Sequence, residues 1–323
     1  MPGEPTRYGV KLASHFIDIP RMLELARHAE ARGYHSVWTT EGRMAPDSVT
    51  LTAAIAATTR RVRVGTSVVN PFTRSPGLVA ITAASIDRIS AGRFVLGIGT
   101  GDPASLDKQH IDHSRPVTRL REYVTVMRDL WSGKPVDFSG ETLRISDLTM
   151  DFTPHQDQLP VYVAATGPRA LMQAGDIGDG ILLNIGVGTD AVAKIAETAH
   201  SGRHVDVVGS VVVGMDRDPE VAVRGTKPLV VTYLTRFPAI ARVSGVPDSV
   251  VQELHRALSW AGMEAACAAL PDRCVHRLAA VGTPADCRRW IREYAADLDE
   301  ALLTPAFGDP GTIIDELAGL ITR

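Results

Sequence analysis

The chain has 323 residues, of which 45% are hydrophobic and 22% are charged, and these values are ordinary for a globular enzyme. The formal net charge is −3 and the arginines are scattered among acidic residues, so the composition argues against a nucleic-acid partner. Residues 1–7 lack an apolar signal core and no apolar run approaches about 18 residues. We therefore expect a soluble, cytoplasmic protein without a membrane partner.

The first half of the sequence alternates short β-branched segments with longer segments of helical periodicity. The helix predicted at 75–90 has Ser75-Pro76 at its start and Gly92 after its end, which are typical helix boundaries. Four strand–helix units in succession predict a parallel sheet covered by outer helices. The strands are predicted at 8–13, 36–40, 62–69 and 93–98, and the helices at 20–32, 48–59, 75–90 and 115–131.

The second half continues this alternation with two interruptions. Residues 136–145 alternate polar and apolar around Ser139-Gly140, which predicts a hairpin within an insertion at about 134–158. A helical stretch predicts a second insertion, at about 216–273, after the seventh strand. The remaining strands are predicted at 160–165, 180–183, 205–215 and 301–307, and the helices at 168–175, 191–200, 219–235, 248–270, 284–298 and 310–321.

Eight strands with outer helices predict an α/β fold, a (β/α)8 TIM barrel that forms a single domain over residues 1–323. The alternative is a doubly wound open sheet. Such a sheet usually has G-x-G-x-x-G after its first strand, whereas Ala13-Ser14-His15 follows the first strand here.

In a barrel of this kind the active site lies at the carboxyl ends of the strands. Glu41 follows the second predicted strand, where its carboxylate could orient a cofactor ring or manage a proton. A plain rim carboxylate is the alternative. His15 and Asp102 follow the first and fourth strands and are candidates for acid–base chemistry, although a lone histidine is more often structural.

Two backbone segments could contact a cofactor. Gly97, Gly99 and Gly101 expose bare backbone after the fourth strand, which suits a flat ring, and no Gly-Lys-Ser/Thr follows to make a P-loop. Thr166 and Gly167 precede a predicted helix, whose first amides could bind a phosphate. An ordinary capped helix start explains the second segment equally well.

No metal site is predicted. His110 and His113 lie in one loop with Asp107 and Asp112, but the spacing matches no known ligand motif. The three cysteines fit neither a disulfide framework nor a zinc site, and we interpret them as packing or surface residues. They are Cys267, Cys274 and Cys287.

Together these segments resemble the luciferase-like flavin and deazaflavin oxidoreductases. The resemblance is strongest to the branch that uses the deazaflavin coenzyme F420, which includes methylenetetrahydromethanopterin reductase and F420-dependent glucose-6-phosphate dehydrogenase. It spans nearly the whole chain. The segments that carry it are SVWTTE (36–41), VGTSVVNP (64–71), Ser75-Pro76, RISAGRFVLGIGTG (88–101), PVYVAATGP (160–168), DIGDG (176–180) and VGTP (281–284).

The resemblance implies an F420-dependent oxidoreductase that transfers hydride between C5 of the deazaflavin and a C=C or C=N bond of a small organic substrate. It also implies a bulge in the third strand, with a non-prolyl cis peptide at Ser67–Val68 behind the ring, and a phosphate near Ala165. The candidate cofactor contacts are Thr40, Ser67, Val68, Asn70, Gly99, Thr100, Gly101, Ala165, Thr166 and Gly167. The candidate catalytic residues are Glu41, His15 and Asp102.

The resemblance is also compatible with two other functions. An FMN-dependent two-component monooxygenase is the main alternative, and a non-catalytic flavin-binding barrel is the second. The glucose-6-phosphate dehydrogenases have Asp-His at the end of strand two, whereas this chain has Glu41-Gly42, which argues against sugar oxidation. Relatives often dimerise, so a homodimer is possible, but core packing explains the apolar outer helices equally well.

Overall fold

The computed structural model describes residues 6–13, 17–42, 44–165, 168–200 and 205–321, with backbone alone for 168–169, 189 and 198–200. Eight parallel strands close into a barrel, because β9 pairs with both β8 and β11. This confirms the predicted (β/α)8 barrel. The strands of the barrel are β1 (Arg7–Leu12), β2 (Ser36–Thr40), β3 (Arg63–Ser67), β4 (Phe94–Ile98), β7 (Val161–Ala165), β8 (Gly180–Leu183), β9 (Asp206–Met215) and β11 (Glu300–Phe307).

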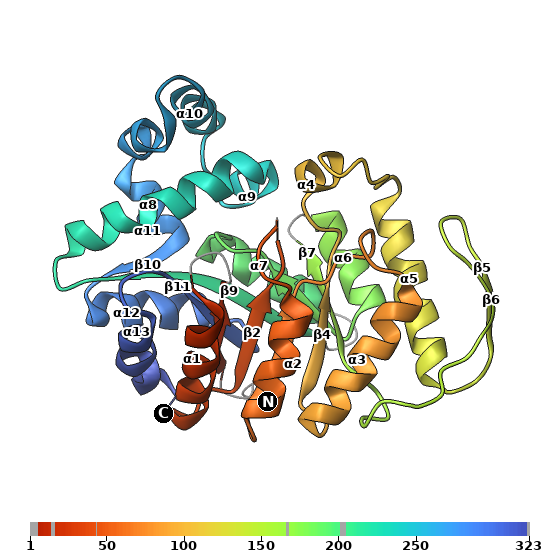
Figure 1. Ribbon diagram of the computed structural model, residues 1–323. Coiled ribbons are helices and arrows are strands. Elements are labelled where there is room, and N and C mark those ends of the chain that lie inside the picture. Colours follow the sequence, from red (N-terminus) through yellow and green to blue (C-terminus); the bar gives the residue numbers. More distant parts are fainter. Residues whose placement is uncertain (1–5, 14–16, 43, 166–167, 201–204, 322–323) are drawn as a thin grey trace.

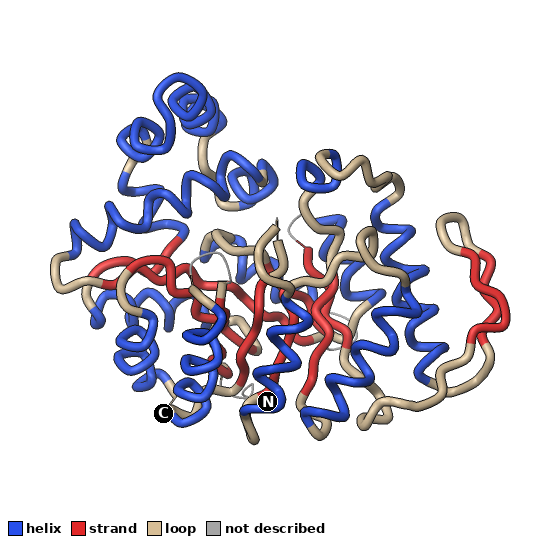
Figure 2. The backbone as a smooth tube through the Cα atoms, viewed as in Figure 1, coloured by secondary structure: helices blue, strands red, loops and turns tan. Residues whose placement is uncertain are grey.

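Helices surround this sheet on its outer face (Figure 2). Their starts follow local capping signals, as at Ser75, whose side chain accepts a hydrogen bond from the amide of Leu78. Thr283 and Asp286 form a reciprocal capping box at the start of α12. The outer helices are α1 (Ile19–Ala31), α2 (Ser48–Thr58), α3 (Pro76–Ser90), α5 (Pro116–Trp131), α6 (Pro168–Ile177), α7 (Thr189–His200), α12 (Pro284–Ala295) and α13 (Pro310–Leu317), followed by the short 3-10 helix η1 (Ala318–Leu320).

One strand of the main sheet was not predicted from the sequence. β10 (Ala279–Gly282) pairs in parallel with Val212–Met215, the second half of β9. This half of β9 is available because β8 pairs only with residues 206–208. A four-residue segment of small residues shows no alternation that would predict a strand. It pairs in the structure because β9 extends beyond the residues that pair with β8.

The two interruptions have different structures (Figure 1). The first contains an antiparallel hairpin, β5 (Val136–Ser139) and β6 (Arg144–Leu148), which projects beyond α5. The second is a helical run that extends past its predicted end. It lies at the same end of the barrel as the short helix α4 (Pro103–Asp107). Its helices are α8 (Pro219–Arg236), α9 (Pro238–Val243), α10 (Asp248–Ala269) and α11 (Asp272–Leu278).

The inside of the barrel is packed with side chains at alternate positions of the strands. Gly65 faces inward, since a Cβ there would lie 2.4 Å from Cε3 of Trp38, so the indole fills this space. The inner cluster consists of Trp38, Val95, Tyr162, Leu182, Val208 and Leu302. Of the helices in the described part of the chain, none combines the length and apolarity needed to cross a membrane.

Candidate active site

The chain leaves β3 through a bulge at the mouth of the barrel. The Ser67–Val68 peptide bond is cis, as the resemblance implies. Beyond it the amide of Val69 donates to the carbonyl of Gly97 at 2.8 Å, and the amide of Gly99 donates to the carbonyl of Val69 at 3.0 Å. Ser67 and Val68 are half-buried, so the bulge forms part of the wall of the mouth.

The glycines after β4 let the backbone approach its neighbours closely. A Cβ at Gly99 would lie 2.8 Å from Cγ2 of Val68 and 2.9 Å from Cβ of Ala164. Gly101 has a φ of +75°, and a Cβ there would lie 2.0 Å from Nδ2 of Asn70. Side chains at these positions would displace the bulge, so packing within the protein itself requires bare backbone here.

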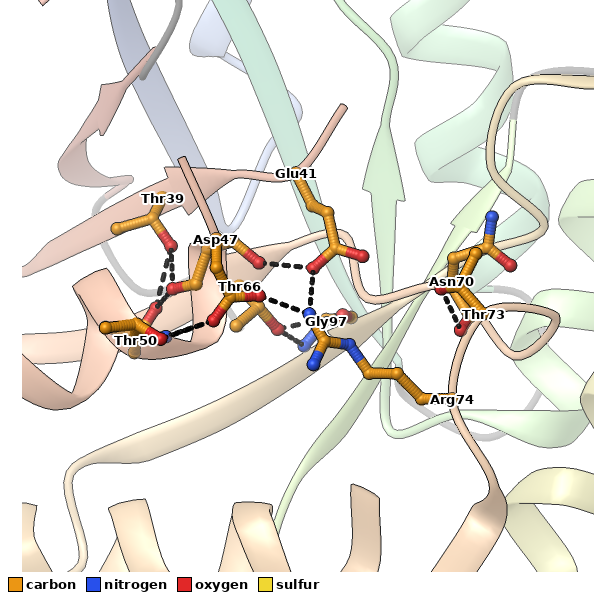
Figure 3. Close-up of polar contacts among 11 residues, drawn as sticks. Thr39, Glu41, Asp47, Thr50, Thr66, Asn70, Thr73, Arg74 and Gly97 are labelled. Atoms are coloured by element: carbon orange, nitrogen blue, oxygen red, sulfur yellow. Dashed lines mark hydrogen bonds and ion pairs between the residues drawn. The ribbon is translucent and has the colours of Figure 1, made fainter. Parts of the chain in front are cut away.

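Glu41 lies at the mouth, where it is held by two neighbours (Figure 3). Its Oε2 accepts a hydrogen bond from Oγ of Ser48 at 2.7 Å and forms an ion pair with Nη2 of Arg74 at 3.2 Å. Arg74 also pairs with Asp47, and its carbonyl accepts a hydrogen bond from Tyr123. The sequence prediction included Glu41 but missed Arg74, which lies in a loop 33 residues away.

The other candidate residues near the bulge differ in their contacts and in their exposure. Thr40 is buried and pairs in register with Ser67. Oδ1 of Asn70 accepts from the amide of Phe72 at 2.7 Å, and the carbonyl of Asn70 accepts from Oγ1 of Thr73 in the same loop (Figure 3). Thr100 is half-buried and Gly101 is exposed.

Asp102 connects the loop after β4 to the helical insertion. It forms an ion pair with Arg236 at the end of α8, and the two side chains are 15% and 25% exposed. Asp102 also precedes α4, although its side chain makes no capping hydrogen bond. The pair therefore joins the two segments that rise above the mouth.

Three candidate residues, His15, Thr166 and Gly167, lie outside the described residues. Ala165 is buried at the end of β7, and α6 begins three residues later at Pro168. The assigned roles of all the candidate residues stay predictions.

A buried lysine inside the barrel was not among the predicted residues. Nζ of Lys11 donates to Oγ of Ser210 at 2.5 Å, and Oγ of Ser210 donates to the carbonyl of Leu183 at 3.0 Å. Burial lowers the pKa of Lys11 to about 7. The sequence signal for this residue is a lysine within the apolar first strand. Lys11 lies two residues after Gly9, so its side chain points to the same face of the strand.

A small apolar pocket lies between the barrel and the insertion. Ile185, just after β8, and Val212 of β9 line its barrel side. Leu229, Tyr233 and Ile240 line its insertion side. Within the described residues, no group of three or more His, Cys, Asp or Glu side chains is arranged to hold a metal.

Comparison with known proteins identifies similar sequences and structures. A family model described as luciferase-like monooxygenase matches residues 3–300. The 5,10-methylenetetrahydromethanopterin reductase of Archaeoglobus fulgidus is 29% identical over 305 residues, which cover 88% of this chain and 90% of that protein. The F420-dependent glucose-6-phosphate dehydrogenase of Gordonia bronchialis is 33% identical over 244 residues, which cover 68% and 72%. The structure of the coenzyme F420-dependent tetrahydromethanopterin reductase from Methanopyrus kandleri has a TM-score of 0.87, with 23% identity and 98% coverage of both chains.

Proposed function

The chain belongs to the luciferase-like monooxygenase family, and from this membership we propose that it is an F420-dependent oxidoreductase. The observation that carries the proposal is the 33% identity to an enzyme named for its dependence on F420.

The proposed reaction is hydride transfer between F420 and a C=C or C=N bond of a small organic substrate. F420, when bound, supplies the hydride chemistry at its C5, and the protein supplies position, electrostatics and the exclusion of water. Gly42 has no side chain, and a Cβ there would meet nothing within 4 Å. Position 42 therefore cannot supply the acid–base side chain that the glucose-6-phosphate dehydrogenases have there. From this we infer that the substrate is not a sugar phosphate.

The residues at the mouth fit a flat ring. Ser67 and Val68 present the half-buried edge of the bulge, and bare backbone at Gly99 brings Val68 and Ala164 together. The half-buried Ser67 and Val68 and the exposed backbone of Gly101 form the surface against which the planar ring would lie. Ala165 would lie on the phosphate side, where Thr166 and Gly167 precede the first amides of α6.

Glu41 and Asp102 receive different roles in this proposal. The carboxylate of Glu41 is already engaged by Ser48 and Arg74, so we assign it to orienting the cofactor ring rather than to moving a proton. Asp102 is engaged by Arg236. We assign it to holding the insertion over the mouth, and a proton-transfer role would require this pair to separate.

The helical insertion would cover the substrate. The apolar pocket beneath α8 and α9, lined by Leu229, Tyr233 and Ile240, supports this assignment because an apolar cover excludes water from the reacting atoms.

Cofactor binding tests the proposal directly. The purified protein is titrated with F420 and, separately, with FMN, and binding is followed by fluorescence. We expect F420 to bind more tightly. Tight binding of FMN without binding of F420 would contradict the proposal and favour an FMN-dependent monooxygenase, whereas failure to bind either would favour a non-catalytic barrel.

A further inference from the structure

The carboxylate of Glu41 lies beside the segment 67–74, which contains the bulge. Thr40, the residue before Glu41, pairs in register with Ser67, and the amide of Glu41 donates to the carbonyl of Ser67 at 3.4 Å. The carboxylate reaches the other end of the segment, where it forms an ion pair with Arg74. Glu41 therefore contacts both ends of the segment whose surface the proposed function assigns to the ring.

Arg74 is held in place independently of Glu41. Its carbonyl accepts a hydrogen bond at 2.9 Å from the hydroxyl of Tyr123, a buried residue of α5. Its guanidinium also pairs with Asp47, the N-cap residue of α2, whose Oδ2 accepts from the amide of Thr50 at 2.8 Å. Because α5 and the start of α2 both fix this arginine, Glu41 is the side chain that the ion pair restrains.

The two carboxylate oxygens of Glu41 differ in their contacts. Oε2 accepts from Oγ of Ser48 at 2.7 Å and from Nη2 of Arg74 at 3.2 Å, and Figure 3 shows both dashed lines ending on this oxygen. Within the described part of the chain, no residue donates a hydrogen bond to Oε1. The side chain is 20% exposed, and Oε1 is not among the buried polar atoms that lack a partner. Oε1 is therefore an oriented acceptor that a ligand in the mouth can reach.

The charges around this oxygen favour a hydrogen-bond donor over an anion. One guanidinium lies between two carboxylates, those of Glu41 and Asp47, so negative charge exceeds positive charge here and Arg74 does not form a phosphate site. A carboxylate oxygen accepts hydrogen bonds, and these bonds are stronger than those between neutral groups. The ring of a flavin or deazaflavin has an N–H group at its edge, which is the kind of donor that Oε1 can bind.

We propose that Arg74 is a positioning residue of the cofactor site, which holds Oε2 of Glu41 so that Oε1 accepts a hydrogen bond from an N–H group at the edge of the bound ring. This inference rests on the proposed function and adds to it the residue that fixes Glu41. Arg74 acts through the carboxylate and does not itself contact the ring. Loss of Arg74 should therefore weaken cofactor binding only while the carboxylate is present.

A double-mutant cycle on cofactor affinity tests this dependence. The dissociation constant of F420 is measured by fluorescence titration in the wild type, Arg74→Met, Glu41→Gln and the double variant. Glu41→Gln should bind F420 about tenfold more weakly, the loss expected for one hydrogen bond to a charged group, and Arg74→Met about threefold to tenfold more weakly. In the Glu41→Gln background, Arg74→Met should cost less than about twofold, because the arginine has lost the group through which it acts.

Equal losses in the two backgrounds would overturn the proposal, since Arg74 would then act on the site independently of Glu41. An Arg74→Met variant that binds F420 as tightly as the wild type would overturn it too. Arg121→Met, which changes an exposed residue of α5, is the matched control and should leave the affinity unchanged. If Arg74→Met does not fold, Arg74→Lys takes its place in the cycle, because lysine keeps the charge but loses the fork of donors. The same two outcomes then decide the proposal.

Salt dependence separates positioning from simple attraction between the guanidinium and an anionic cofactor. Attraction at a distance is screened over about 10 Å at 0.1 M salt and about 3 Å at 1 M salt. We expect the loss of affinity in Arg74→Met to persist across this range, because its contact with Glu41 is direct and partly buried. A loss that disappears at the higher salt concentration would overturn the proposal.

These experiments keep the two proposals separate. If F420 binds and the cycle shows no coupling, the arginine proposal is overturned and the F420 function stands. If the wild type binds FMN instead of F420, the proposed function fails, and the same cycle with FMN decides the role of Arg74, because that ring also has an N–H group at its edge. If neither cofactor binds, both proposals are overturned.

Discussion

The lower end of the barrel interior, where the strands begin, and the upper end, where they finish, hold their charged groups among different partners. At the lower end, Arg7 pairs with Asp206 at 3.1 Å, Tyr162 donates to the same carboxylate, and Ser36 donates to Glu300. At the upper end, the Lys11 ammonium has a hydroxyl as its partner and no paired carboxylate among the described residues.

This difference separates stability from function. In barrels of this kind the chemistry lies at the carboxyl ends of the strands and the opposite face serves stability. At the lower end Arg7 and Asp206 neutralise one another and Glu300 is held by Ser36, whereas the mouth at the upper end exposes the backbone of Gly101. We therefore expect changes at the lower end to affect folding alone, and changes at the upper end to affect binding as well.

The largest expected effect is at the lower end. Glu300→Ala removes a fully buried carboxylate that accepts from Ser36 and faces Arg7. We expect the free energy of unfolding to fall by roughly 2–5 kcal/mol, because the buried hydroxyl of Ser36 loses its acceptor and a cavity replaces the carboxylate side chain. Urea denaturation measures this, with Glu264→Ala as the exposed control. A loss equal to that of the control would show that the lower network does not stabilise the barrel.

The second prediction concerns pH and the upper end. Because the folded-state pKa of Lys11 is about 7, below the unfolded value of about 10.4, the unfolded chain binds more protons between these values. Stability should therefore rise with pH across this window, by up to about 1.4 kcal/mol per pH unit from this residue. Lys11→Met should remove this contribution and be more stable than the wild type at pH 7. Urea denaturation at pH 7 and pH 9 measures it, and equal pH dependence in both proteins would contradict the prediction.

The barrel could be predicted from the sequence, whereas the partners of its charged residues could not. The eight barrel strands follow from the strand–helix rhythm, and the Ser67–Val68 bond follows from resemblance. The partners of the charged residues do not, since Lys11 and Ser210 are 199 residues apart and Asp102 and Arg236 are 134 apart. Such pairs exist only after the barrel closes. β10 was missed for a related reason, because its pairing depends on the length of β9.

A third prediction concerns the backbone surface at the mouth. Gly99→Ala places a Cβ 2.8 Å from Val68 and 2.9 Å from Ala164, so the bulge must shift. We expect a loss of about 1–3 kcal/mol in unfolding free energy. The affinity for F420 should also fall about tenfold, which corresponds to about 1.4 kcal/mol of binding free energy. Gly42→Ala is the matched control, since its Cβ would meet nothing within 4 Å. Equal F420 affinity in both variants would exclude this surface from the cofactor site.

The smallest expected effect is at the contact between the loop after β4 and the insertion. Asp102→Asn breaks a partly exposed ion pair with Arg236, so unfolding free energy should fall by about 1 kcal/mol or less. A double-mutant cycle with Arg236→Gln should give a coupling energy of about 0.5–1 kcal/mol, and zero coupling would contradict the pair. If Asp102 only holds the insertion, Asp102→Asn should raise KM for a substrate and leave kcat nearly unchanged. A fall in kcat of about 10²–10⁴-fold, with the coupling intact, would instead assign Asp102 to proton transfer and place chemistry, as well as closure, at this contact.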